Sequence, residues 1–336
     1  MKHQITTFSR ERHPALWWGV VLLSFASPLV EHTLNVYFAQ NNNNNYLVLN
    51  EMNLGKQSLV FALVLSTAAC SSFNYSSDTS LTVRSTQQLP AVLSESSGLL
   101  CEADGIVSLN DSGNNPELFW VNYDGAVSNT VSIPVTNKDW EALAADNRYM
   151  YVADVGNNHG KRDSVQIYKV LKSDPQQVST IEVSYRGNNP TRNTSYAHDY
   201  DAEAMVVAKD RLLLFSKSWK TKVAHVYEVN TQQKSQTLVP ISHIEGLPGV
   251  ITGADFDSTE DRFVVVGYLS DPFGNFDTFM AHVSSTFEVI EVWPLEGFKQ
   301  VEGVCISPSG NYYFSQEAID EQPATLTEAN VTLVGV

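Results

Sequence analysis

Short hydrophobic runs separated by polar turns recur along this chain, and the pattern repeats five times. Each repeat opens on a residue pair and continues into a second run rich in β-branched and aromatic residues, which is typical of a buried strand. The pairs are Ser97-Gly98, Glu141-Ala142, Glu203-Ala204, Thr252-Gly253 and Glu302-Gly303, which start 44, 62, 49 and 50 residues apart by position number, and the second runs cover residues 105–108, 149–152, 212–215, 263–266 and 312–314.

Repeats of this length with several short strands each predict a β-propeller, in which every repeat is a blade around a central channel. We expect an all-β, five-bladed propeller over residues 80–336, with the opening pairs on the innermost strands. The fourth strands of the first four repeats are expected at residues 127–133, 180–185, 237–241 and 289–293. The last repeat has room for one more strand, at about 329–336, so residues 81–85 would supply its outer strand and close the ring. The alternative is an open sandwich with an accidental period.

Residues 52–70 have the pattern of a signal peptide: Lys56, an apolar run and small residues before Cys70. Cys70 resembles the processing site of bacterial lipoproteins, in which this cysteine becomes the lipidated first residue. The resemblance implies a membrane anchor at Cys70 and a tether over residues 71–79. Because Ser71 rather than aspartate follows, it also implies the outer membrane, with the propeller facing the periplasm. A plain secretory signal is the alternative.

Residues 1–51 precede this signal and are expected to be an upstream extension, either not translated or disordered to loosely helical. Their apolar stretch, residues 15–30, is interrupted by Ser and Pro and short for a membrane-spanning helix. A genuine N-terminal anchor is the competing interpretation.

The overall charge bears on the partners. The formal net charge is −16, and a phosphate backbone requires a Lys/Arg surface that this chain lacks, so nucleic acid is excluded as a partner. A net negative charge of this size favours a bound cation over an anionic partner. We expect a monomer.

Two cysteines remain inside the repeats, Cys101 in the first and Cys305 in the last, and these blades are neighbours in a closed ring. They lie four residues after Ser97 and three after Glu302, so their side chains are expected on opposite faces of their strands. We therefore expect two buried thiols rather than a disulfide.

The opening residues place chemistry on the axis. Carboxylates of Glu141, Glu203 and Glu302 would repel one another there unless they were protonated, hydrated or paired with a cation. Calcium accepts six to eight oxygen ligands, and the hydroxyls of Ser97 and Thr252 would complete the set with waters. Neither His nor Cys enters the ring, which disfavours zinc. A hydrated acidic channel without metal is the alternative.

The order Ser, Glu, Glu, Thr, Glu is similar to that in the calcium-activated apyrases, five-bladed nucleotidases whose axial calcium is ringed by Ser, Glu, Glu, Ser, Glu. Residues 93–99, which open the first repeat, and 301–304, which open the last, are also similar to the corresponding segments of the apyrases. The resemblance implies axial calcium and a calcium-dependent phosphohydrolase or esterase. A closer similarity, through residues 110–114, 139–141 and 154–157, is to uncharacterised bacterial secreted propellers, which imply no activity.

Residues that end the second strands should surround one mouth of the channel, joined by neighbouring loop residues. The candidate ligand-binding residues are Asp111, Asn114, Asp154, Asn157, Asn158, Asp199, Lys217, Tyr268 and Glu317. This face is acidic and amide-rich, which suits a carbohydrate, a peptide or a second cation better than a polyphosphate, whose hydrolysis needs cationic groups. Asp and Asn are equally ordinary turn formers.

We therefore expect a binding module for an unknown small ligand or protein partner, with calcium serving structure. The first alternative is the apyrase-like phosphohydrolase or esterase. A glycosidase, with two carboxylates flanking a bond, is a minor third. The sequence does not decide whether the protein is an enzyme, because propellers host many unrelated functions.

Overall fold

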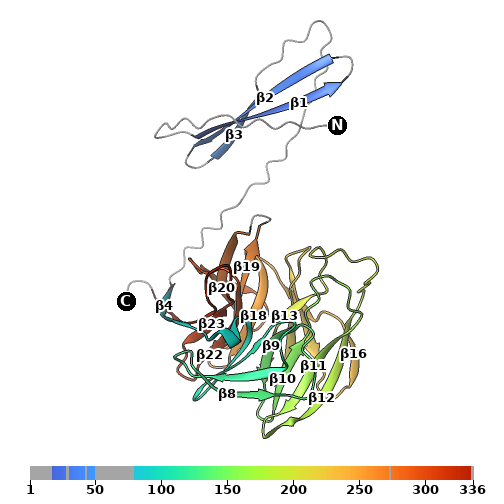
Figure 1. Ribbon diagram of the computed structural model, residues 1–336, viewed down its shortest axis with the longest axis vertical. Coiled ribbons are helices and arrows are strands. Elements are labelled where there is room, and N and C mark those ends of the chain that lie inside the picture. The colour runs from blue at the N-terminus through green and yellow to red at the C-terminus, as the bar shows by residue number, and fades with distance from the viewer. Residues whose placement is uncertain (1–16, 28–29, 42–43, 50–78, 272–273, 334–336) are drawn as a thin grey trace. The chain divides into compact units, whose positions relative to one another are not determined.

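The chain divides into two compact units, Met1–Ser72 and Phe73–Val336. The computed structural model describes residues 17–27, 30–41, 44–49, 79–271 and 274–333 (Figure 1). Cys70 and the predicted signal peptide therefore lie outside the described residues. In the described part of the chain, no helix has the length and apolar character needed to cross a membrane.

The first unit contains a three-stranded antiparallel sheet in the order β1-β2-β3. Its strands are Trp17–Ser27, Val30–Asn41 and Asn44–Leu49. The sheet occupies a segment in which we expected disordered or loosely helical chain.

The second unit is a five-bladed β-propeller, as the repeats predict (Figure 1). Its innermost strands contact one another in a closed ring, β5 with β9, β13, β18, β22 and back to β5. The blades, from inner to outer strand, are β5 (Ser96–Glu102), β6 (Gly105–Asn110), β7 (Glu117–Val121) and β8 (Val127–Ser132); β9 (Trp140–Ala145), β10 (Tyr149–Asp154), β11 (Val165–Leu171) and β12 (Asp174–Tyr185); β13 (Ala202–Ala208), β14 (Arg211–Ser216), β15 (Ala224–Val229) and β17 (Ser242–Ile244); β18 (Val250–Asp257), β19 (Arg262–Ser270), β20 (Phe276–Ser284) and β21 (Val289–Pro294); and β22 (Val301–Ile306), β23 (Tyr312–Gln316), β24 (Thr325–Leu333) and β4 (Thr79–Gln88).

An N-terminal strand closes the ring. Strand β4 pairs antiparallel with β24, the third strand of the last blade. The predicted closure by residues 81–85 is thus confirmed. Strand β24 begins at Thr325, four positions earlier than expected.

The outer strand of the third blade differs from the prediction at residues 237–241. Strand β16 (Ser235–Leu238) instead pairs parallel with β12 and extends the second blade to five strands, while β17 completes the third. Pro240 has no backbone N–H to give to a strand ladder, so the apolar run breaks there. Leu238 before the break is buried in the hydrophobic cluster that contains Val183 of β12, whereas Ile241 after it is exposed.

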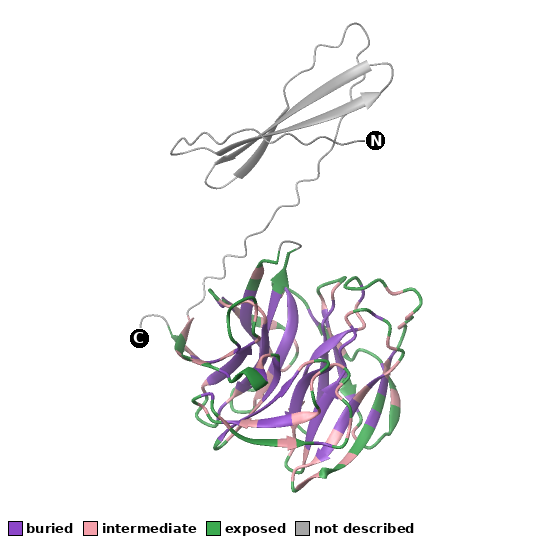
Figure 2. Cartoon of the chain, in the orientation of Figure 1, coloured by how far each residue is buried: buried purple, intermediate pink, exposed green. Residues whose placement is uncertain are grey.

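The hydrophobic core lies between neighbouring blades. The described residues form five clusters, one for each pair of adjacent blades, and one of these clusters joins the fifth blade to the first. Burial is deepest along the inner strands and falls toward the outer ones (Figure 2). Packing between blades therefore fixes the inner strands that carry the axial residues.

Each inner strand carries a β-bulge where its opening pair lies. In β9, for example, Trp140 pairs with Asp154 and Ala142 with Ala153, which leaves Glu141 as the extra residue. The same shift leaves Glu203, Thr252 and Glu302 extra in β13, β18 and β22, and falls between Ser96 and Leu99 in β5. Bulges re-aim side chains, so the repeated pair in the sequence is the signature of five bulges at one end of the channel.

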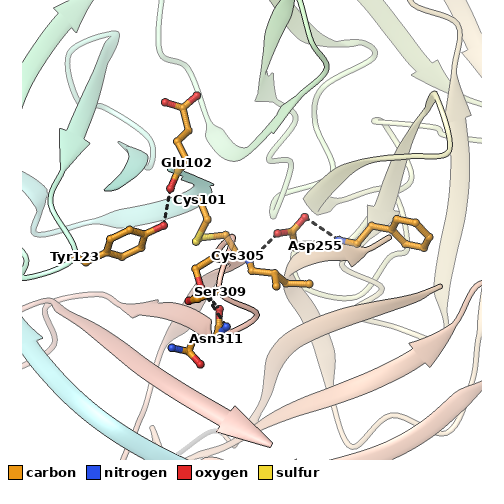
Figure 3. Close-up of a disulfide and its surroundings, with 10 residues drawn as sticks. Cys101, Glu102, Tyr123, Asp255, Cys305, Ser309 and Asn311 are labelled. Carbon is orange, nitrogen blue, oxygen red and sulfur yellow. Dashed lines mark hydrogen bonds between the residues drawn. A yellow bond between two sulfur atoms is a disulfide. The ribbon is translucent and has the colours of Figure 1, made fainter. Parts of the chain in front are cut away.

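A disulfide joins Cys101 to Cys305, with Cα atoms 5.4 Å apart (Figure 3). The expectation of two free thiols is therefore wrong. Cys101 belongs to the cluster between the first and last blades, while Leu100 packs toward the second blade. Cys305 joins the same cluster from the other side, while Val304 packs toward the fourth blade. In a propeller, one face of each blade packs against the opposite face of the next blade. Two cysteines on opposite faces of neighbouring blades can therefore lie in contact.

Candidate functional site

The axial residues converge as the sequence predicts. A narrow cavity along the axis is lined by Glu141, Glu203, Thr252 and Glu302, among others. The three glutamates are only 4%, 3% and 6% exposed. Ser97 is buried to a similar degree.

The two hydroxyls of the ring join neighbouring blades. The Ser97 hydroxyl donates to the backbone carbonyl of Glu141 at 2.8 Å, and the Thr252 hydroxyl donates to that of Val301. Each bond runs from one inner strand to the next. These hydroxyls therefore have a structural role that requires no metal.

A lysine supplies positive charge to the ring. The Lys217 ammonium pairs with the Glu203 carboxylate and donates to the Tyr268 hydroxyl at 3.0 Å. Lys217 is only 4% exposed, so it is not the accessible mouth cation that we expected. Burial alone would lower the pKa of Lys217, but the charges of Glu203, Tyr268 and Glu302 raise it well above its usual range. The protein thus provides a counter-ion of its own.

One lysine does not neutralise the other carboxylates around it. Burial raises the pKa of Glu302 to about 8, although Lys217 opposes the shift. Burial and the neighbouring Asp111 raise the pKa of Glu317 to about 8 as well. Burial raises the pKa of Glu141 well above its usual range, and Asp111 and Glu203 add to the shift.

A second acidic group adjoins the ring at the mouth. Ligand atoms of Asp111, Asp139 and Glu141 all lie within 4.8 Å of one another. No described residue donates a hydrogen bond to the Asp139 or Glu141 carboxylate, whereas Asp111 accepts one from the backbone of Ser112. Burial, followed by Asp111 and Asp201, raises the pKa of Asp139 to about 7. Among the described residues, none forms an ion pair with these three carboxylates.

A glycine backs this acidic group. A Cβ at Gly156 would lie 2.2 Å from Glu141 Oε1 and 2.5 Å from Asp139 Oδ2, so any larger residue would intrude on both carboxylates. Asp139 is absent from the predicted site residues. Its signal in the sequence is its place two positions before Glu141, at the start of the second repeat.

The other predicted mouth residues mostly hold loops together. Arg162 pairs with the fully buried Asp154 at 2.6 Å, and Asn157 donates to the Tyr200 carbonyl at 2.8 Å. The Asn114 amide donates to the Asp111 carbonyl at 3.2 Å, and Asp199 accepts from the backbone of Lys220 at 3.0 Å. Asn158 has a buried side-chain oxygen without a hydrogen-bond partner among the described residues.

The raised pKa values predict how stability depends on pH. With a chelator present, the free energy of unfolding should fall as the pH rises from about 5 to about 8, because Glu302, Glu317 and Asp139 keep protons in the native state that the unfolded chain has released. Denaturant unfolding at several pH values measures this. Stability that rises over the same range would contradict the burial of these acids.

Comparisons with known proteins identify no family for the chain. No family model matches the chain, and no curated protein matches its sequence. The resemblance to the apyrases therefore gains no support from the family comparison. Similar solved structures include a glucose dehydrogenase (TM-score 0.41, 11% identity, 73% of this chain and 99% of that chain). They also include virginiamycin B lyase from Staphylococcus aureus (TM-score 0.34, 10% identity, 97% of this chain and 93% of that chain).

Proposed function

We propose that this protein is a calcium-dependent ligand-binding module whose cation is held at the mouth of the propeller by Asp111, Asp139 and Glu141. The observation that carries the proposal is the buried Glu141 carboxylate, which is 4% exposed and receives no hydrogen bond from the described residues. A buried carboxylate without a donor is costly unless it is protonated or binds a cation.

The chemistry of the three residues suits calcium. All three offer carboxylate oxygens, which this ion prefers, and the group contains neither His nor Cys. Waters and a ligand would complete a coordination shell of six to eight oxygens. Glu141 is the one residue that this set shares with the predicted axial ring. Glu203 is paired with Lys217, and the hydroxyls of Ser97 and Thr252 donate to backbone carbonyls.

Binding is favoured over phosphate hydrolysis. A phosphohydrolase needs cationic groups that reach the phosphates beside its metal. Lys217 is buried against Glu203, and Arg162 is buried against Asp154, so both are already engaged. The mouth that remains is acidic, which suits a neutral or cation-bridged ligand.

The proposed location follows from the N-terminal sequence, with a lipid anchor at Cys70 in the outer membrane. The disulfide between Cys101 and Cys305 supports an oxidising compartment such as the periplasm.

Calcium should raise the melting temperature of the chelator-treated full-length protein at pH 8. An ion that binds only the native state stabilises it by about 2.7 kcal/mol at a hundred times its dissociation constant. Asp139→Asn should remove most of this calcium response, because it withdraws one charged ligand. Thermal unfolding with and without calcium measures the shift for each protein.

Glu302→Gln is the matched control, because Glu302 belongs to the axial ring and not to the proposed set. It should retain the calcium response. A response lost in Glu302→Gln but kept in Asp139→Asn would place the ion in the axial ring instead. If no divalent ion shifts the melting temperature of the parent protein, the proposal fails.

A further inference from the structure

We propose that a cavity between the second and third blades binds a small, hydroxyl-rich ligand that carries an oxyanion. The cavity has a volume of about 600 Å³, within the range of about 300–1,000 Å³ usual for small-molecule sites. Its walls come from the segment that links β12 to β13 and from the residues around β15. This site is separate from the acidic group at the mouth and does not depend on the proposed cation.

The charge of the cavity is opposite to that of the chain. Arg186, Arg192 and Lys220 line it, and Asp199 is its only carboxylate among the described residues. One Asp199 oxygen is already occupied, because it accepts from the backbone N–H groups of Lys220 and Thr221 at 3.0 and 3.1 Å. In a chain with a formal net charge of −16, three cations around one cavity require an explanation.

These cations are free to bind a ligand. The described residues give the side chains of Arg186, Arg192 and Lys220 no hydrogen bond and no ion pair. A guanidinium presents paired N–H donors that match the oxygens of a carboxylate or a phosphate. Two of them with an ammonium therefore fit an oxyanion group.

Hydrogen bonds with residues 160 and 161 hold the segment that carries Arg186 and Arg192 in place. Lys161 donates to the carbonyls of Pro190 and Asn193 at 3.1 and 2.8 Å, and the Asn193 amide donates to the Gly160 carbonyl at 3.1 Å. His198 Nδ1 accepts from the Tyr200 N–H at 3.1 Å, which leaves its other nitrogen to donate to the Asn158 carbonyl. A fixed wall lowers the entropy lost when a ligand binds.

The remaining lining defines the body of the ligand. Asn189 and Thr194 offer amide and hydroxyl groups, and Tyr200 offers ring surface. Side chains of this mixture recognise hydroxyl groups on a compact polar body. A sugar phosphate and a sugar carboxylate share the required chemistry.

Isothermal titration calorimetry on the full-length protein with chelator present tests the site, with glucose 6-phosphate, glucuronate, inorganic phosphate and glucose as probes. At least one anionic sugar should bind at least about tenfold more tightly than glucose, and the stronger of the two decides between phosphate and carboxylate. Arg186→Gln and Arg192→Gln should each weaken that binding by about tenfold or more. The affinity for inorganic phosphate measures how much of the binding comes from the oxyanion alone.

Arg211→Gln is the matched control, because Arg211 is an exposed arginine paired with Glu228 outside the cavity. It should leave the affinity unchanged. The proposal is overturned if no anionic probe binds, if glucose binds as tightly as the anionic sugars, or if Arg211→Gln weakens binding as much as the cavity variants. The cation proposal has its own readout, the calcium response, so the two can fail independently.

Discussion

Lys217→Met is expected to lower the free energy of unfolding at pH 7.5 by about 3–5 kcal/mol, because it leaves the buried Glu203 carboxylate without its partner. Methionine keeps most of the length of the side chain, so the loss reports charge rather than volume. Denaturant unfolding of the purified full-length protein measures it. The loss should shrink toward pH 5, where Glu203, whose pKa burial already raises, can take up a proton.

Two further variants test the explanation. The double variant Lys217→Met with Glu203→Gln should recover part of the lost stability, because it removes both charges together. Lys222→Met replaces an exposed lysine in the same loop and should change stability by less than about 0.5 kcal/mol. Similar losses in Lys217→Met and Lys222→Met would show that Lys217 is not the counter-ion of the axis.

Replacement of both Cys101 and Cys305 by alanine is expected to cost about 2–5 kcal/mol of unfolding free energy, as is usual for a native disulfide. The bond spans a sequence separation of 204, and a cross-link over so long a loop restricts the unfolded chain strongly. It also fastens the first blade to the last, where β4 closes the ring.

Unfolding with and without a reductant measures this contribution. The parent protein should lose stability when reduced, and the double alanine variant should not respond to the reductant. Intact mass under native and reducing conditions detects the bond directly. An unchanged midpoint for the reduced parent protein would contradict a stabilising role for the bond.

The blades were predictable because burial is periodic. Each inner strand is buried over at least its first four residues, so the hydrophobic runs repeat in the sequence wherever a blade begins. The closing strand was predictable because the last repeat is one strand short. The division of residues 235–244 between two blades was not anticipated, because it depends on Pro240 and on where Leu238 packs.

The site was only partly predictable, because its charges are settled by contacts between strands. The convergence of Glu141, Glu203 and Glu302 followed from the repeat. The pairing of Lys217 with Glu203 did not, because it depends on a side chain from the end of β14 reaching the axis. Asp139 was not among the predicted site residues because it lies just before β9, outside the repeated pair.

The three bulges that carry Glu141, Glu203 and Glu302 keep the axial charges apart from the packing between the blades. A bulged glutamate stands outside the regular pairing of its inner strand, while the residues on either side of it pair with the second strand of the blade. Isosteric exchanges at these positions, such as Glu203→Gln, therefore alter the electrostatics of the axis with little change in the packing around it. The three axial charges can therefore be removed one at a time, and the electrostatic effect of each can be measured separately.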